Sequence, residues 1–351
     1  MKIFKASNHQ IYVEDKLASL PAYIKSGNYG KVFVFVDTNT SQLCLPIFQD
    51  LMDGFSEFDV IETDAGEENK NIDFCIGIWK TLLDFQADRK SLMINLGGGV
   101  ITDMGGFIAS TYKRGIDFIN IPTSLLAQVD ASVGGKTGID IDAVKNMVGT
   151  FALPKAVFIE SAFLKTLPSR ELLAGYAEMI KHALILDKAY YESLKSGNPM
   201  QIDPEWIAHS VDLKNEVVLT DPLEKGLRKI LNFGHTIGHA IESFSLAHDK
   251  QPLNHGEAIA IGMIIEAYLG TKFTGLSTND YQDIKNYISS LYPNYQVNPK
   301  HFKKLLTYMY SDKKNENGTL LFSLISSIGT CKYNIEVSEN EVLQALAYHF
   351  N

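Results

Sequence analysis

The chain has 351 residues, of which 45% are hydrophobic and 21% charged, and its formal net charge is −9 at pH 7. This composition is typical of a globular protein and excludes disordered, collagen-like and coiled-coil chains. The acidic balance disfavours general nucleic-acid binding, because the phosphate backbone attracts positive surface, but it allows an anionic small molecule that meets a local cluster of bases. The length favours two domains.

The three cysteines, Cys44, Cys75 and Cys331, are too few and too far apart for a disulfide framework or a CxxC site. They predict buried free thiols in a reducing compartment. The first 15 residues lack the apolar core of a signal peptide, and no run reaches the roughly 18 apolar residues of a membrane span. The expectation is a cytoplasmic protein with no membrane or nucleic-acid partner.

The first 160 residues alternate between predicted strands and helices. Short runs rich in Val, Ile and Phe predict strands at 32–36, 92–96, 118–121 and 156–159, and apolar periodicity predicts a helix at 71–85. This alternation indicates an open α/β sheet. Residues 1–160 are therefore expected to form a nucleotide-binding α/β domain.

After residue 160 helical periodicity dominates, and residues 161–351 are expected to form a mainly helical domain. Helices are predicted at 171–185, 204–219, 235–244, 256–269, 280–291 and 339–349, with a small hairpin at 320–325 and 331–335.

Two segments of the first domain favour anion binding. Three glycines, 97–99, join a predicted strand to a predicted helix, where backbone amides are free for a phosphate, although Thr102 breaks the GxGxxG fingerprint and a plain tight turn is the alternative. Asp37 ends the first strand, where it could grip a ribose or only cap a helix. In the second segment Asp130 breaks the P-loop spacing. The bases Lys136 and Lys145, among small and apolar residues, favour an anion site of another kind, with solvated surface lysines as the alternative.

The helical domain carries a possible metal site. Glu178 and Lys181 share one helical face, and the spacing predicts a shared face for Asn232, His235 and His239. His255 stands near the start of another predicted helix. One Glu with two His is the ligand composition of a catalytic zinc site, whereas the alternative makes the histidines ordinary polar residues of an amphipathic helix.

In order along the chain, the segments GGGVITDMGGFIAS, YKRGIDFINIPTSLLAQVDASVGGKTGI, KNMVG, ELLAGYAEMIKHALI, NFGHTIGHAIE, NHGEAIAIGM and SDKKNENG resemble the 3-dehydroquinate synthase family of sugar-phosphate cyclases. The resemblance implies a Rossmann-like NAD-binding domain followed by a mainly helical metal and substrate domain. It also implies a lyase that converts 3-deoxy-D-arabino-heptulosonate 7-phosphate to 3-dehydroquinate and phosphate, in the shikimate pathway of aromatic amino-acid biosynthesis. The implied steps are transient NAD-dependent oxidation, phosphate elimination, re-reduction and intramolecular aldol closure.

The resemblance also implies roles for individual residues. One divalent metal is implied, either zinc or cobalt in place of zinc. Its ligands match Glu178, His235 and His255, whereas His239 matches a substrate contact. The positions that match the catalytic and substrate-binding site are Asp130, Lys136, Asn146, Lys181, Lys214, Arg228, Asn232, His239 and Lys314, with Lys313 as the alternative to Lys314.

Other positions match the NAD-binding stretches of the family: Asp37, Ala65, Gly66, Glu67, Glu68, Asn69, Lys70, Gly99, Val100, Ile101, Thr102, Asp103, Thr123, Ser124, Lys136, Lys145, Phe163, Leu164, Lys165 and Thr166. Arg114 matches an arginine that the neighbouring subunit contributes to the phosphate site, which implies a homodimer.

Three alternatives remain at this stage: another sugar-phosphate cyclase, a metal-dependent polyol dehydrogenase on the same fold, and a non-catalytic NAD-binding protein. The dehydrogenase needs fewer anion-binding bases than the chain offers in Lys136, Lys181, Lys214 and Arg228. The sister cyclases act on substrates that have no carboxylate. The presence of Lys214 and Arg228 therefore favours the heptulosonate, which has one.

Overall fold

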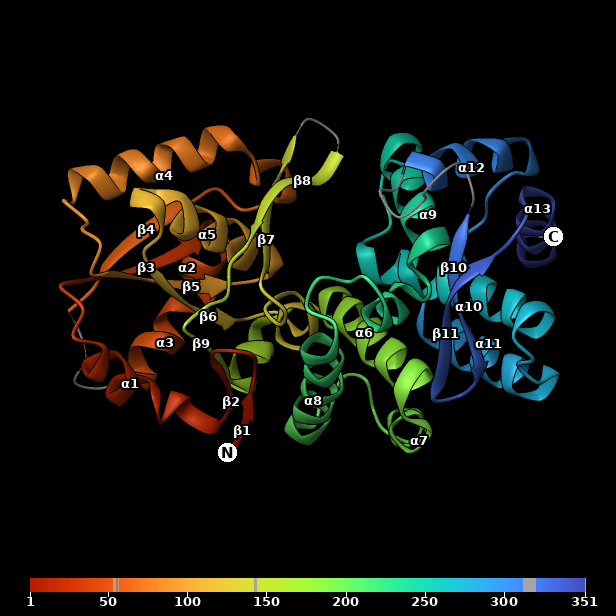
Figure 1. The fold of residues 1–351 in the computed structure, drawn as a ribbon, viewed down its shortest axis with the longest axis horizontal. Helices are drawn as coiled ribbons and strands as arrows, with labels where there is room; N and C mark the ends of the chain where they lie inside the picture. The colour runs from red at the N-terminus through yellow and green to blue at the C-terminus, as the bar shows by residue number, and fades with distance from the viewer. Residues whose placement is uncertain (53–54, 56, 142–143, 312–319, 351) are drawn as a thin grey trace. The chain divides into compact units, whose positions relative to one another are not determined.

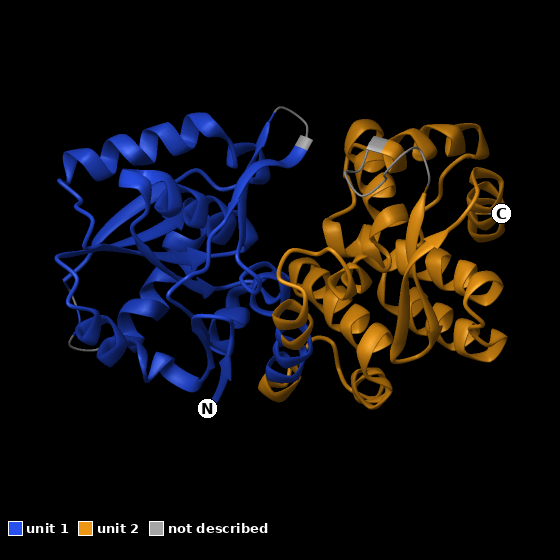
Figure 2. Ribbon diagram, viewed as in Figure 1, with its two compact units in different colours: residues 1–168, 207–215 blue, residues 169–206, 216–351 orange. Residues whose placement is uncertain are grey.

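The structure is a computed structural model that describes residues 1–52, 55, 57–141, 144–311 and 320–350 (Figure 1). Contacts divide the chain into two compact units (Figure 2). Unit 1 comprises Met1–Pro168 and Ile207–Asn215, and unit 2 comprises Ser169–Trp206 and Glu216–Asn351. The expected domain division after residue 160 stays a prediction.

Unit 1 is built on a seven-stranded sheet in the order β1-β2-β9-β6-β5-β3-β4, parallel except where β1 pairs with β2. The four predicted strands are confirmed as β3 (Lys31–Asp37), β5 (Ser91–Gly97), β6 (Asp117–Pro122) and β9 (Ala156–Ile159). Three further strands, β1 (Lys2–Lys5), β2 (Gln10–Val13) and β4 (Asp59–Thr63), lie at or near the edges of the sheet. Shorter apolar runs at the edges explain why these strands were not predicted.

Alternating residues of β3 are buried on opposite faces of the sheet. Val32, Val34 and Val36 pack with α1 (Leu20–Gly27) and α3 (Leu45–Leu51), while Phe33 and Phe35 pack with α4 (Ile72–Asp84) and α5 (Gly99–Thr111). The first two helices cover one face of the sheet and the other two cover the opposite face (Figure 1). Because helices cover both faces, the strand is apolar throughout rather than alternating, as the sequence predicts. The expected Rossmann-like α/β architecture is thereby confirmed.

A hairpin of β7 (Lys136–Ile141) and β8 (Val144–Phe151) follows β6 and carries several of the predicted site residues. It packs on α5, where Ser110 Oγ lies 2.8 Å from Thr150 Oγ1. The hairpin was not predicted, because glycines such as Gly138 and Gly149 interrupt its apolar pattern. Those glycines are required where the two strands cross closely: a Cβ on Gly149 would lie 2.1 Å from the Thr137 carbonyl oxygen.

Unit 2 is mainly helical, as expected. Its helices are α6 (Ser169–Leu186), α7 (Lys188–Ser196), α9 (His235–His248), α10 (His255–Phe273), α11 (Thr278–Leu291), α12 (Phe302–Ser311) and α13 (Glu339–Phe350), and the predicted hairpin is confirmed as β10 (Leu321–Ser327) and β11 (Thr330–Glu336). Helix α8 (Pro204–Thr220) contributes to both units, and α2 (Thr38–Leu43) belongs to unit 1. No helix in the described part of the chain is long and apolar enough to cross a membrane.

Helices α9 and α10 approach each other backbone to backbone in unit 2. A Cβ on Gly262 would lie 2.0 Å from the Gly234 carbonyl oxygen and 2.7 Å from the Gly238 nitrogen, so only glycine fits at this crossing. The predicted shared helical face of Asn232, His235 and His239 is wrong, because Asn232 ends a separate 3-10 helix (Leu227–Asn232). Gly234, with φ +81°, separates that turn from α9.

Candidate metal and substrate site

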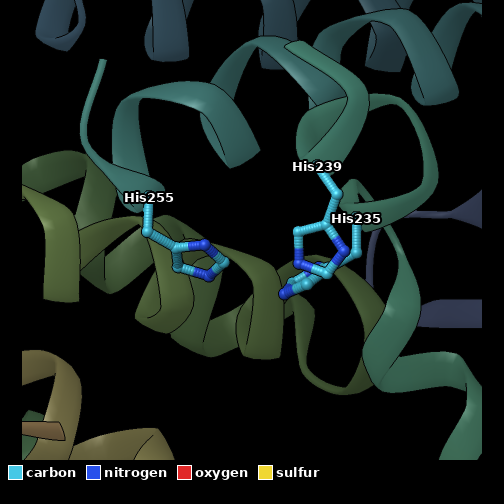
Figure 3. Close-up of side chains that lie close together, drawn as sticks. All are labelled: His235, His239 and His255. Atoms are coloured by element: carbon cyan, nitrogen blue, oxygen red, sulfur yellow. The ribbon is translucent and has the colours of Figure 1, made fainter. Parts of the chain in front are cut away.

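Three histidines of unit 2 face one another (Figure 3). His235 and His239 come from the first turns of α9, and His255 is the first residue of α10. Their ligating nitrogens all lie within 4.8 Å of one another. The close glycine crossing of α9 and α10 is what brings residues 16 to 20 positions apart into one cluster.

The carboxylate of Glu178, on α6, completes this cluster. Its Oε1 lies 3.5 Å from His235 Nε2 and 3.8 Å from His255 Nε2, and the residue is fully buried. Among the described residues no group donates a hydrogen bond to this oxygen. Lys181 pairs with the other oxygen, Oε2, so within the ranges that the structure describes it is Oε1 that lacks a hydrogen-bond donor and faces the two imidazole nitrogens. A buried oxygen in this state is costly without a partner, so the site fits a divalent metal.

Hydrogen bonds at the far nitrogens orient two of the imidazoles. His235 Nδ1 lies 3.0 Å from the Phe233 carbonyl oxygen, and His255 Nδ1 lies 3.1 Å from Glu242 Oε2. Each acceptor favours a proton on Nδ1, which leaves the Nε2 lone pair directed toward Glu178. The two imidazoles are therefore held in the tautomer that a metal requires.

His239 is a further candidate ligand for the same ion. Its ring centroid is 5.2 Å from that of His235 and 5.7 Å from that of His255. The three histidines have the spacing of a metal site, and the two distances from Glu178 Oε1 also suit Glu178, His235 and His255 as ligands. The assignment of His239 to the substrate stays a prediction.

Basic and amide side chains of unit 2 lie close to these residues or are held by local contacts. Lys181 forms an ion pair with Glu178 one helical turn away, which confirms their shared face. The buried Arg228 donates from Nη1 to the Pro222 carbonyl oxygen at 2.8 Å, and Asn232 Nδ2 donates to Glu224 Oε1 at 2.9 Å.

In unit 1, the buried Lys214 pairs with the partly buried Asp130. Lys214 Nζ donates to both the backbone oxygen and Oδ1 of Asp130, each at 2.6 Å. The lysine comes from α8 and the aspartate from a π-helical turn (Ala127–Ala131) that follows β6. Two predicted substrate-site residues far apart in sequence are thus brought together.

Lys70 links the predicted cofactor stretches to the β7–β8 hairpin. Its Nζ donates to Asp103 Oδ2 at 2.8 Å and to Asn146 Oδ1 at 2.7 Å. Burial alone would lower the pKa of Lys70, but the carboxylates of Asp103 and Glu67 raise it above its ordinary value. Asn146 has a backbone φ of +52°, and its backbone N–H donates to Asp140 Oδ1 at 2.7 Å.

The glycine turn opens α5 as predicted. The Thr102 hydroxyl donates to the carbonyl oxygens of Gly98 and Gly99, and the Thr123 amide donates to the Gly97 carbonyl oxygen at 3.0 Å. A Cβ on Gly98 would lie 3.4 Å from Ser124 Oγ, so the predicted residues 99–103 and 123–124 are neighbours. Val100, Ile101 and Asp103 continue the first turns of α5.

Asp37 caps α2, where its Oδ1 accepts from the Thr40 amide at 2.7 Å. This is the helix-cap alternative for Asp37, and a ribose contact stays a prediction. The predicted stretch 65–70 forms a turn around a 3-10 helix (Glu67–Asn69), and 163–166 lie in another (Ser161–Thr166), where Phe163 is part of the core.

The remaining predicted residues are exposed at the surface or lie outside the residues that the structure describes. Lys136 begins β7 and is exposed, Lys145 Nζ lies 3.8 Å from Glu67 Oε1, and Arg114 is exposed in a short turn after α5. Lys314 and its alternative Lys313 lie outside the described residues.

Sequence reasoning missed two buried carboxylates beside the cluster, Glu242 on α9 and Glu266 on α10. The available signal was their position: each is a charged residue among apolar residues of a predicted helix, and a buried charge requires partners.

Comparison with known families covers most of the chain. Residues 60–174 match the model of the 3-dehydroquinate synthase N-terminal region, and residues 175–315 match that of the C-terminal region. The chain is 40% identical over 343 residues to the 3-dehydroquinate synthase of Parabacteroides distasonis, covering 97% of each protein.

Solved structures share the fold. A 2-deoxy-scyllo-inosose synthase, complexed with carbaglucose-6-phosphate, NAD+ and Co2+, superimposes with a TM-score of 0.88 at 23% identity, over 99% of this chain and 100% of that one. A 2-epi-5-epi-valiolone synthase from Streptomyces hygroscopicus, with NAD+ and Zn2+ bound, gives 0.82 at 24% identity, over 99% and 98% of the two chains. At these identities the likeness establishes the fold.

Proposed function

The chain belongs to the 3-dehydroquinate synthase family, and we propose that it binds NAD in unit 1 and one divalent metal on Glu178, His235 and His255 of unit 2. It is an enzyme of the shikimate pathway, a carbon–oxygen lyase that forms 3-dehydroquinate with elimination of phosphate. One observation carries the metal assignment: the buried Glu178 Oε1 faces the Nε2 atoms of His235 and His255. The Nδ1 atom of each of these rings already has a hydrogen-bond partner in the protein. Zinc suits this nitrogen and oxygen donor set, and cobalt can take its place.

Bound NAD supplies a hydride acceptor that is restored within each turnover, and a bound divalent metal supplies Lewis-acid polarisation of the substrate's hydroxyl and carbonyl oxygens. The side chains have the remaining tasks. Lysines and arginine provide the positive charge that a carboxylate and a phosphate need, which an acidic protein can supply only locally. We assign these contacts to Lys136, Lys181, Lys214 and Arg228, with Lys314 beyond the described residues.

Further roles follow from the residues' chemistry. We assign His239, Asn232, Asp130 and Asn146 to hydrogen bonds with substrate hydroxyl or phosphate groups. The NAD-binding assignment rests on the glycine turn before α5, whose first amides lack intrahelical partners and suit a pyrophosphate. The other proposed cofactor contacts come from residues 65–70, 123–124 and 163–166, together with Asp37, Lys136 and Lys145.

Metal analysis of single variants tests the ligand assignment. Glu178→Ala, His235→Ala and His255→Ala should each lose tight metal binding, because a three-ligand site rarely survives on two. His239→Ala should keep close to one ion per chain while turnover falls. Loss of the ion from His239→Ala with retention in His255→Ala would replace the proposed set by one that includes His239.

A cofactor assay tests the redox cycle. If oxidation and re-reduction occur in one bound complex, substoichiometric NAD should support many turnovers with release of phosphate. Accumulation of NADH in step with product would instead identify a dehydrogenase.

We also propose a homodimer and a cytoplasmic location. The exposed position of Arg114 in its turn supports presentation to a second copy of the chain. The free thiols of Cys44, Cys75 and Cys331 support a reducing compartment.

A further inference from the structure

We infer that Glu266 is a positioning residue for the metal site, acting through the first turn of α9. The inference rests on the proposed assignment of His235 as a metal ligand. Glu266 lies on α10 and is fully buried. Its Oε2 accepts from the Gly234 amide at 2.6 Å, and its Oε1 accepts from the Ile237 amide at 3.0 Å.

These two amides are the ones that a helix normally satisfies with its own residues. Gly234 is the N-cap of α9 and Ile237 is its third residue. In a capping box, the N-cap side chain accepts from the third amide, and the third side chain accepts from the N-cap amide. Helix α10 has this arrangement in Asn254 and Glu257, whereas α9 receives both halves from one carboxylate of another helix.

The close helix crossing explains why α9 cannot cap itself. Gly234 has φ +81°, and a Cβ there would lie 2.5 Å from Met263 Cγ and 3.2 Å from the Ile259 carbonyl oxygen. A capping side chain is therefore excluded by both conformation and space. The same contact with α10 places Glu266 within reach of the free amides.

The capped turn carries the proposed ligand. His235 lies between the two amides that Glu266 accepts from, and its Nδ1 faces the Phe233 carbonyl oxygen just before them. The backbone from 233 to 237 therefore determines where His235 Nε2 points. Because metal ligands must be held within about 0.5 Å of their productive positions, fraying of this turn would weaken the site.

A buried carboxylate at this place also has a favourable field. The N-terminus of α9 carries partial positive charge from amides that have no partner within the helix. An ionised acceptor also forms stronger hydrogen bonds than a neutral one. Glutamine has nearly the same shape, but its side-chain NH2 is a donor. It would lie opposite one of the two backbone N–H groups and could not accept a hydrogen bond from it. Glu266→Gln thus removes one of the two capping hydrogen bonds and the negative charge, with little change in volume.

The test measures Co2+ affinity by competition with a chromogenic chelator, together with the visible spectrum of the bound ion and hydrogen exchange at Gly234 and Ile237. Glu266→Gln should bind Co2+ about tenfold more weakly or worse, the range found when groups that orient metal ligands are removed. Its spectrum should shift, and the two amides should exchange faster. Glu266→Asp retains the charge but is too short for both amides, so its affinity should fall between wild type and Glu266→Gln, and it serves if the glutamine variant does not fold.

Glu160→Gln is the matched control. Glu160 is also buried and accepts from two backbone amides, those of Lys16 and Ala162, but it lies in unit 1. It should lose stability without change in Co2+ affinity or spectrum. A folded Glu266→Gln variant with affinity within twofold of wild type would overturn the inference, and so would a Glu266→Asp variant with wild-type affinity if the glutamine variant does not fold. His235→Ala, measured alongside, separates the two proposals, because wild-type affinity in that variant would overturn the ligand assignment itself.

Discussion

Glu242 Oε2, on a buried side chain, accepts a hydrogen bond from Nδ1 of the partly exposed His255 at 3.1 Å. Glu242 lies on α9 and His255 on α10, so the contact also ties the two helices together. The carboxylate selects the tautomer with Nδ1 protonated and raises the basicity of Nε2, the atom nearest Glu178. His255 is thus oriented by a charged partner, whereas His235 is oriented by a backbone carbonyl.

Removing this partner should weaken metal binding. We expect Glu242→Ala to lower metal affinity roughly 10- to 100-fold, as is typical for partners of ligating histidines, measured by chelator competition. Glu242→Gln should recover part of the loss, because its carbonyl oxygen can still accept from Nδ1. The exposed Glu216→Ala should match wild type. Equal affinities in Glu242→Ala and wild type would show that His255 needs no such partner.

The glycine crossing should tolerate no methyl group. Gly262→Ala would place a Cβ 2.0 Å from the Gly234 carbonyl oxygen, so α9 must move away from α10. Overpacking of this kind costs about 1–3 kcal/mol, and the shift should also lower metal affinity because it separates His235 from His255. Gly77→Ala on α4 is the control, since no atom lies within 4 Å of its Cβ. Helix propensity predicts that this variant gains up to about 1 kcal/mol. Urea denaturation distinguishes the two, and equal midpoints would contradict the close crossing.

Unit 1 should lose stability in mild acid through His9. Burial lowers the pKa of His9 to about 4, while the unfolded chain keeps a pKa near 6.5. The unfolded state therefore binds the proton first: the contribution is fully present above pH 6.5 and is lost as pH falls from 6.5 toward 4. The loss amounts to at most about 3 kcal/mol.

His9→Leu should remove this part of the pH dependence, because nothing remains to protonate. The measurement is the free energy of unfolding of both proteins between pH 7 and pH 4. Parallel curves would show that His9 gains a proton in the folded state as readily as in the unfolded one.

Arg114 should serve the neighbouring subunit. Arg114→Ala and Lys136→Ala dimers should each be weak, the first without the borrowed charge and the second without the resident one. Unfolding the two variants together and re-forming dimers at random gives about half mixed dimers, each with one intact site, so roughly a quarter of wild-type activity should return. A remixed sample that sediments as a dimer but stays as weak as its parents would place Arg114 in its own subunit's site or in none.

Local sequence was sufficient for the elements whose pattern is continuous. Strands β3 and β5 are apolar throughout because helices cover both faces of the sheet, and α4 follows the helical period closely. The motifs also indicated the family, with Glu178, His235 and His255 as candidate ligands. The β7–β8 hairpin escaped prediction because its glycines serve a close strand crossing rather than a strand pattern.

Tertiary structure alone decided how the candidate ligands are held. The sequence places Glu266 29 residues after Ile237 and 32 after Gly234, and no local period links such positions. They meet because Gly234, Gly238 and Gly262 let two helix backbones touch, which leaves room for one carboxylate and none for a capping side chain on α9. The break at Gly234 that separates Asn232 from α9 has the same origin. Side-chain types and helical periods are properties of neighbouring residues, whereas the orientation of an imidazole depends on which distant backbone or carboxylate the packing brings to its other nitrogen.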